Sequence, residues 1–416
     1  MVLGIFAFTI SMARVAIFRA GPAFKGQGYM YTELARALAS GQGFTETHGA
    51  WRGHATIMRA PLWPFVLSLP MRGFPRYSPA SIAELTTAFT HAITAFAVAV
   101  LVGILSGGIR RRMLLAVLMT ALLPEVQPFL GGYSEPLAAA ILVTGTILLC
   151  RGQRFFWGGV LTLSLLPLVR PNFAPLWIVV TALIWWLQFH NRSPFVFANK
   201  RRLIAAALLF YIPSAAWVVR NYWVSGAFPV LAGTASMTFY GNYNPLSATP
   251  GLGFGSWVGP DSIPGEEKTV SLSRRMSEVE TLRYWDLKGK EFIAQHWKVV
   301  PLLMVAHVVH PVLPSLADRS HKYSFWLLRL LLYAATFMAV RQGAVRLDSW
   351  FAVLLTCSVL VSAVTIVLYS GDGRYLYPLN VLFVVLVCST RYKRFALPAR
   401  PRHKSSTEKD RLVDVG

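Results

Sequence analysis

The sequence predicts an all-α polytopic membrane protein with about 10 transmembrane helices, within a range of roughly 9–12. Composition is the first observation behind this class: 55% of the 416 residues are hydrophobic, only 14% are charged, and the mean hydropathy is +0.49. The second is that apolar runs near the roughly 20 residues needed to cross a bilayer recur along the chain. The third is that lysine and arginine lie mostly in short segments between those runs. This combination excludes a soluble enzyme.

Each apolar run supplies one predicted span. The predicted spans occupy residues 2–18, 83–105, 114–130, 136–150, 155–169, 174–189, 203–219, 323–340, 350–369 and 375–388. The first is short, carries Arg14 and precedes no convincing cleavage site, so we expect it to stay as an anchor. A further run, 299–316, contains His307, His310 and three prolines. We expect this run to dip into the membrane without crossing it, because that topology fits the charges of the neighbouring loops.

The basic residues determine the expected orientation, because loops rich in lysine and arginine stay in the cytoplasm. Such segments occur at 109–112, 190–202, 341–346 and beyond 390. Both termini are therefore expected inside, with two long loops, 19–82 and 220–297, on the periplasmic face of the inner membrane. Residues 1–390 form a single predicted transmembrane domain, and 391–416 form a basic cytoplasmic tail that is expected to be disordered.

The net charge of +22 raises the question of nucleic-acid binding. The distribution of the basic residues argues against it, because they follow the positive-inside pattern. Cys150, Cys357 and Cys388 all lie within apolar runs and share no ligand-like spacing. Neither a disulfide framework nor a zinc site is therefore expected.

The stretch 26–65 is polar, aromatic and basic, and it lies between two hydrophobic segments. Residues 31–38 are expected to form a short interfacial helix, because their leucines and alanines share one face. Glu33 points away from that face and from lipid. Gly41 and Gly43 end the helix.

The second long loop is rich in glycine, proline and asparagine as far as Gly265 and then becomes helical in pattern. Ser277 and Glu280 have the spacing of a capping box, which marks the start of a helix. Apolar residues recur on one side of the segment that follows, so we expect an amphipathic helix lying on the membrane.

The loops carry two kinds of side chain that suit group transfer: a carboxylate that can take a proton and arginines that can neutralise an anion. Glu33 is the candidate base, and an exposed ion pair with Arg36 is its alternative role. Arg59 lies beside Pro61 in the first loop, at a membrane re-entry where an arginine either forks to a phosphate or snorkels to the interface. Arg170, Arg220 and Arg374 each end a predicted span on the outer side, which favours phosphate or sugar contacts for at least one of them.

Acidic residues in the second loop raise the possibility of a divalent metal. They are Asp261, Glu266, Glu267 and Asp286. Their spacing matches no defined metal loop, so solvated carboxylates are the favoured interpretation. Glu135 is expected to pair with one of the arginines, because a buried carboxylate needs a partner.

Short motifs follow one another in a recognisable order. They are Tyr31-Thr-Glu33-Leu-Ala35-Arg-Ala-Leu38, Gly41-Gln-Gly43-Phe44, Arg59-Ala-Pro61-Leu-Trp-Pro64-Phe65, Ser134-Glu135-Pro136, Leu168-Val-Arg170-Pro171, Trp217-Val-Val-Arg220-Asn221-Tyr222 with Gly226, Tyr240-Gly-Asn242 and Arg374-Tyr375-Leu-Tyr377-Pro378. This ordered set resembles the class C glycosyltransferase superfamily, and the resemblance covers nearly the whole chain. The superfamily includes protein O-mannosyltransferases, lipid A aminoarabinose transferases and enzymes of the Rhizobium lipid A galacturonosyltransferase type.

The resemblance implies an inner-membrane enzyme that takes a sugar from a polyprenyl-phosphate carrier and hands it to a lipid, glycan or protein acceptor on the outer face. It implies substrate-binding roles for Tyr31, Arg59, Arg170, Arg220, Tyr240, Asn242 and Arg374. One position departs from the pattern. Many relatives carry a catalytic aspartate before the motif tyrosine, whereas Gln27, Tyr29 and Met30 occupy that neighbourhood here. Glu33 would take the base role, or Glu46 would, or the second loop supplies the base, or activity is altered or absent.

Two other classes of function fit the same composition. One is a transporter or flippase of a lipid-linked saccharide, which would also need many spans and buried arginines. The concentration of polar residues in two loops on one face favours surface chemistry over transport. The other is a noncatalytic relative that assembles envelope glycans.

Overall fold

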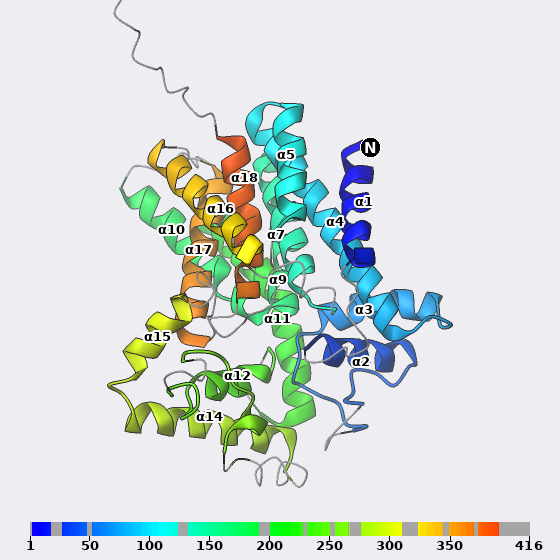
Figure 1. The fold of residues 1–416 in the computed structure, drawn as a ribbon, viewed down its shortest axis with the longest axis vertical. Coiled ribbons are helices and arrows are strands. Elements are labelled where there is room, and N and C mark those ends of the chain that lie inside the picture. Colours follow the sequence, from blue (N-terminus) through cyan, green and yellow to red (C-terminus); the bar gives the residue numbers. More distant parts are fainter. Residues whose placement is uncertain are drawn as a thin grey trace, which may run out of the picture.

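The computed structural model in Figure 1 describes residues 2–17, 27–47, 52–123, 132–190, 200–227, 231–249, 254–264, 266, 276–309, 323–343, 349–369 and 373–390. Within these ranges the chain is all-helical, and its β pairing is confined to an isolated bridge between Thr45 and Ala55. This confirms the predicted all-α class.

The bundle is built from nine described helices. They are α1 (Val2–Ile17), α4 (Pro79–Ser106), α5 (Arg110–Ala121), α7 (Glu135–Cys150), α10 (Leu176–Phe189), α11 (Lys200–Ser225), α16 (Tyr323–Arg341), α17 (Trp350–Tyr369) and α18 (Tyr377–Ser389). Four described segments are long and apolar enough to cross a membrane, namely Pro79–Ser106, Pro171–Phe189, Arg201–Ser225 and Trp350–Tyr369. A fifth is added if α14 (Glu278–Gln295) and α15 (Val300–Val309), which are bent by 114°, form one span. The described helices are therefore compatible with a membrane protein.

The main hydrophobic core surrounds α18, which packs against α4, α5, α7 and α16. Almost every residue of α18 is buried, as expected for a helix that is apolar on all sides. An aromatic stack ties α10 to its neighbours, because the ring of Trp177 lies 5.6 Å from that of Phe210 and 6.5 Å from that of Trp350. The centre of the bundle thus forms a rigid frame for the surrounding helices.

The predicted span at 155–169 is interrupted in the structure. It consists of α8 (Phe156–Leu163) and α9 (Leu166–Val169), and a 3-10 turn, Pro171–Phe173, follows. Proline cannot supply the amide hydrogen that continues a helix, so Pro167 and Pro171 start new turns instead of extending the old one. The predicted span at 155–169 is therefore helical in two pieces. The break brings the segment around Arg170 into the interior.

Four helices form a layer at one end of the bundle, called the loop layer below. They are α2 (Gln27–Ala39), α3 (Leu62–Gly73), α12 (Thr234–Asn242) and α14. The start of α5 and the end of α18 lie at the opposite end, where Arg112 donates a 2.8 Å hydrogen bond to the carbonyl of Ser389. Figure 1 therefore shows the two long loops gathered at one end of the molecule and the basic start of α5 at the other.

The helix predicted at 31–38 is confirmed and is longer than expected, because α2 begins at Gln27. The two glycines expected to end it, Gly41 and Gly43, have φ values of 81° and 77°. Glycine adopts this left-handed conformation without the steric cost that other residues incur.

The capping box at the start of α14 is also confirmed. The Ser277 hydroxyl accepts a 3.2 Å hydrogen bond from the Glu280 amide, and the Glu280 carboxylate accepts a 2.7 Å bond from the Ser277 amide. The following run forms α15, which is 10 residues long. The rest of that run, the basic tail 391–416 and the side chain of Arg14 lie outside the described residues.

Candidate functional site

A cavity of about 480 Å³ lies where the bundle meets the loop layer. It is lined by Tyr31, Arg59, Arg170, Pro171, Asn172, Pro175, Val179, Ala232, Thr234, Ala235, Thr238, Leu360, Val361, Val364, Thr365, Tyr369 and Tyr375. Residues from α2, α10, α12 and α17 therefore share one space, although they lie far apart in the sequence. Three of the predicted substrate-binding residues, Tyr31, Arg59 and Arg170, are among them.

Arg59 supplies a buried positive charge to the cavity wall. Its side chain is held from α2, because one terminal nitrogen, Nη2, lies 2.7 Å from the Met30 sulfur and the guanidinium carbon lies 5.5 Å from the centre of the Tyr31 ring. The residue is only 3% exposed. A guanidinium over an aromatic face is favourable and remains able to donate hydrogen bonds from its edge.

Arg170 is the second arginine in the cavity wall. Its Nη1 donates a 2.7 Å hydrogen bond to Oε1 of Glu135, the first residue of α7, and its guanidinium lies 4.5 Å from the centre of the Tyr375 ring. Glu135 is fully buried. The prediction that Glu135 pairs with an arginine is therefore confirmed, and the pair joins α7 to the turn before α10.

The charge of the cavity wall is positive. Among its lining residues, all of which are described, none is acidic. Glu135 offsets one of the two arginines from just behind the wall. Two arginines and no acidic side chain in this lining suit an anionic group, since the interaction of charges strengthens where water is excluded.

One side of the cavity is apolar and reaches the outer surface of the bundle. Pro175 precedes α10 and Val179 belongs to it, and Leu360, Val361 and Val364 come from α17. Leu360 and Val364 are 49% and 57% exposed, so they face both the cavity and the surroundings of the protein. The arrangement suits a ligand with an anionic head and a hydrocarbon tail.

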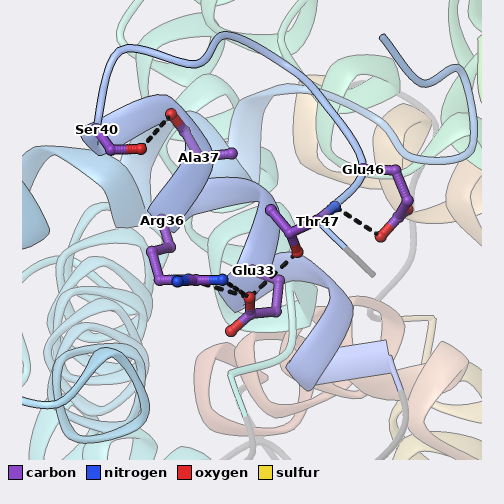
Figure 2. Close-up of polar contacts among 6 residues, drawn as sticks. All are labelled: Glu33, Arg36, Ala37, Ser40, Glu46 and Thr47. Atoms are coloured by element: carbon purple, nitrogen blue, oxygen red, sulfur yellow. Dashed lines mark hydrogen bonds and ion pairs between the residues drawn. The ribbon is translucent and has the colours of Figure 1, made fainter. Parts of the chain in front are cut away.

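Glu33 does not line this cavity. Figure 2 shows Arg36 and Thr47 converging on its carboxylate. Arg36 donates at 2.6 Å and 3.0 Å, and the Thr47 hydroxyl donates at 3.1 Å, all to Oε2. The pair with Arg36 is the alternative role expected from the sequence. The contact with Thr47 adds a link between α2 and the segment that follows it.

A second carboxylate, that of Glu46, belongs to the same region. It accepts a 3.2 Å hydrogen bond from the Thr47 amide. Burial, together with the charges of Glu33 and Glu46, raises the pKa of Tyr29. Two carboxylates, those of Glu33 and Glu46, therefore lie in this part of the loop layer, with Arg36 paired to the first.

Arg220 and Glu278 hold the first loop against the second. Arg220 donates to the carbonyl of Thr56 at 2.6 Å and to that of Phe44 at 3.3 Å. Glu278 accepts from the Thr56 hydroxyl at 2.6 Å and from the Ile57 amide at 3.1 Å. Burial raises the pKa of Glu278. Arg220, which the resemblance assigns to substrate, thus contacts loop backbone and does not line the cavity.

Tyr240 belongs to an aromatic cluster beside α14. Its hydroxyl donates a 3.1 Å hydrogen bond to Glu266, which also accepts from Tyr284 at 2.9 Å, and its ring stacks on Trp285 at 5.3 Å. Burial and the Glu266 carboxylate raise the pKa of Tyr240. Asn242 is fully buried and donates to the carbonyls of Thr238 and Tyr369. It therefore ties α12 to the end of α17, behind the cavity wall.

The remaining candidates are dispersed or undescribed. Within the described residues, no three histidine, cysteine, aspartate or glutamate side chains come close enough to hold a metal ion. Asp286 pairs with Lys290 on the surface of α14. The side chain of Arg374, the side chain of Asp261 and all of Glu267 lie outside the described residues.

Several polar lining residues escaped the sequence analysis. They are Asn172, Thr234, Thr238, Thr365 and Tyr369. Threonines and tyrosines are common in helices, and only the tertiary arrangement brings these onto one wall. The short spacing of Thr234 and Thr238 on α12 places them on one face, which is a weak signal without the fold.

The fold and the site together define an all-helical protein with apolar helices compatible with a membrane and a cavity that has two buried arginines in its wall. No family model matches this chain, and a search of curated proteins found no match either.

Proposed function

We propose that this chain is an integral-membrane glycosyltransferase that moves a sugar from a polyprenyl-phosphate donor to an acceptor lipid, glycan or protein. The observation that carries the proposal is the cavity, which combines buried arginines with an apolar side open to the surface of the bundle. A polyprenyl-phosphate sugar is an anionic group attached to a long hydrocarbon chain. The arginines match the anionic group, and the apolar side of the cavity matches the hydrocarbon chain.

The donor phosphate is assigned to Arg59 and Arg170. Arginine can fork two hydrogen bonds to a phosphate, and such charge-assisted bonds are the strong ones. As the bond between the anomeric carbon and the phosphate oxygen breaks, negative charge grows on the leaving phosphate. Preorganised cations lower the energy of that transition state. Glu135 and the Tyr375 ring hold Arg170 in place for this role.

The isoprenoid chain is assigned to the apolar side of the cavity. Leu360 and Val364 provide a route between the cavity and lipid, so the donor enters without leaving the bilayer. The threonines of α12 and α17 provide hydroxyl groups for the sugar. The donor is thereby held at both ends.

Glu33 is the proposed base of an inverting, single displacement. The acceptor oxygen attacks the anomeric carbon, the carbon–phosphate oxygen bond breaks, and Glu33 takes the acceptor proton. Successive helical residues are separated by about 100°, so Glu33 projects from the side of α2 away from Tyr31. In this arrangement Glu33 lies across α2 from the cavity, so the proposed base role requires α2 to turn the Glu33 carboxylate toward the sugar when donor and acceptor bind. Glu46 is the neighbouring acid and is the alternative candidate for the base.

The proposed placement is the inner membrane, with about 10 spans, both termini in the cytoplasm and the loop layer in the periplasm. The grouping of both long loops at one end of the bundle supports it. So does the position of the basic start of α5 at the other end.

A second candidate is a noncatalytic relative that binds or transports a lipid-linked saccharide. One observation favours it: the cavity lining contains no acidic residue. Turnover distinguishes the two, because a binding protein leaves the donor intact.

Mass spectrometry of envelope glycolipids and glycoproteins tests the proposal, comparing cells with and without the gene. The expected result is the loss of one sugar from one acceptor, restored by the parent gene and not by the Glu33→Gln variant. Restoration by Glu33→Gln with failure of Arg59→Gln would keep the cavity essential and remove Glu33 from the base role. An unchanged envelope in cells lacking the gene would refute the transferase.

A further inference from the structure

The acidic side chains of the described chain are concentrated at one end of the molecule, whereas arginines occur at both ends. Most of the acidic side chains belong to the loop layer and its loops. The others lie in the first two turns of α4 and α7, and both of these helices start near the loop layer. The opposite end carries arginines at the start of α5, at the turn from α7 to α8 and at the start of α11. Part of this second group forms a local cluster, defined here as Arg151, Arg154 and Arg202.

Aromatic rings hold two arginines of the cluster. The Arg202 guanidinium carbon lies 4.4 Å from the centre of the Phe156 ring and 5.7 Å from that of Trp157. The Arg154 guanidinium carbon lies 5.6 Å from the centre of the Phe155 ring. Three consecutive aromatic residues, Phe155 at the end of a 3-10 turn and Phe156 and Trp157 at the start of α8, therefore contact arginines from two different elements. Trp157 is 43% exposed, so the arginines and the rings share one accessible surface.

The cluster is short of negative charge. The Nε of Arg202 is buried and has no hydrogen-bond acceptor among the described residues. The described ion pairs include none to Arg151, Arg154 or Arg202. Glu125 and Asp348 lie outside the described residues. Arg151 and Arg154 are exposed, so their guanidinium donors are open to an acceptor from outside the protein.

We propose that the arginine cluster binds the phosphate of an anionic membrane lipid. Arginines fork to phosphates, and exposed aromatic rings suit the boundary between headgroups and acyl chains. The cluster is remote from the sugar-transfer cavity, because Phe156 contacts Trp350 at the start of α17, whereas Tyr369 at the end of α17 lines the cavity. The proposed lipid site is therefore separate from the donor site. Its test does not depend on the proposed glycosyl transfer.

The test measures lipid selectivity in the full-length protein. The protein is reconstituted in nanodiscs containing equal amounts of phosphatidylcholine and phosphatidylglycerol, and retained lipids are counted by native mass spectrometry after release. The parent protein is expected to retain phosphatidylglycerol preferentially. Arg154→Gln and Arg202→Gln are each expected to reduce that preference about fivefold, the factor that corresponds to one arginine near an anionic surface.

Arg76→Gln is the matched control, because Arg76 is an exposed arginine in the turn before α4 at the loop-layer end. It is expected to leave the preference unchanged. Arg202→Lys keeps the charge and is expected to retain part of the preference. If Arg202→Gln fails to fold, the exposed Arg154→Gln variant decides alone. An unchanged preference in Arg154→Gln, or an equal loss in Arg76→Gln, would overturn the site.

Discussion

Arg170 donates a 2.7 Å hydrogen bond to Glu135 in an ion pair that is almost fully enclosed by the bundle. The same arginine faces the cavity. The pair therefore has two roles. It joins α7 to the turn before α10, and it orients the Arg170 guanidinium toward the proposed phosphate. A buried pair of this kind contributes little net stability, but the loss of one partner leaves an uncompensated charge.

Glu135→Leu is expected to lower the free energy of unfolding by about 3–5 kcal/mol, because Arg170 is then buried without its counter-charge. Adding Arg170→Met should recover much of that loss. Chemical unfolding in detergent, arranged as a double-mutant cycle, measures the coupling. Glu291→Gln, on the exposed face of α14, is the control and should change little. Additive effects of the two buried substitutions would show that the pair is not coupled.

Glu278 gives the contact between the loops a pH dependence. Burial raises the pKa of Glu278 above its usual 4.5, so the folded protein binds this proton more tightly than the unfolded chain does. The stabilising effect is complete below the unfolded pKa and is lost as the pH rises through the folded one. The thermal unfolding midpoint should therefore contain a component that falls with pH in this window, and Glu278→Gln should remove it.

Glu280 provides the matched control for this pH dependence. Its capping bonds with the backbone and hydroxyl of Ser277 lower the pKa of Glu280. Its contribution to stability is therefore present above the unfolded pKa and is lost as the pH falls through the folded pKa. Glu280→Gln should change the pH profile in the opposite sense to Glu278→Gln. Identical profiles for the two variants would contradict the assignment.

The sequence predicted local features well and the site only in part. Turn glycines after α2 and the Ser277–Glu280 box depend on residues a few positions apart, so the pattern alone identifies them. The pairing of Arg170 with Glu135 followed from the general need of a buried carboxylate for a partner. The break in the helix at 155–169 was not predicted, because the run was assigned from its apolar composition and the effect of Pro167 was not considered.

Tertiary contacts account for what the sequence could not show. Tyr31 and Arg59 meet across the first loop, whereas Thr238 and Thr365 reach the same cavity from α12 and α17. None of the threonines carries a charge or a motif that distinguishes it from a helix-surface residue. Arg220 has the sequence context of a substrate contact, yet its guanidinium donates to loop carbonyls that only the folded loop brings near.

Glu33→Gln distinguishes the catalytic role from the structural one. If Glu33 is the base, transfer should fall by about 10²- to 10⁴-fold with donor binding retained. If it only pairs with Arg36, the effect should be confined to stability and stay below about 1 kcal/mol. A transfer assay with the purified protein measures the fall in transfer rate. Arg36→Gln is the control for loss of the Glu33–Arg36 ion pair. Near-normal transfer by Glu33→Gln would move the assignment to Glu46.

Cysteine labelling tests the proposed orientation. Gln42 and Ser262 are exposed in the two long loops, and Arg111 is exposed at the opposite end. In a background with the three native cysteines replaced, cysteines at the first two positions should react with an impermeant reagent in intact spheroplasts. A cysteine at Arg111 should react only after lysis. The reverse pattern would invert the protein in the membrane.

Arg59 tests the central claim most directly, because it lines the cavity and is held by Met30 and Tyr31. The measurement is equilibrium binding of a fluorescent polyprenyl phosphate to the purified protein in detergent. Loss of charge-assisted bonds worth about 1.5–3 kcal/mol should weaken binding by about 10- to 150-fold in Arg59→Gln. The affinity of Arg59→Lys should lie between those of the parent and Arg59→Gln, because lysine keeps the charge but cannot fork. Arg36→Gln should bind as the parent does. Equal binding by the parent and Arg59→Gln, or no saturable binding by the parent, would contradict the assignment of this cavity to a lipid-phosphate donor.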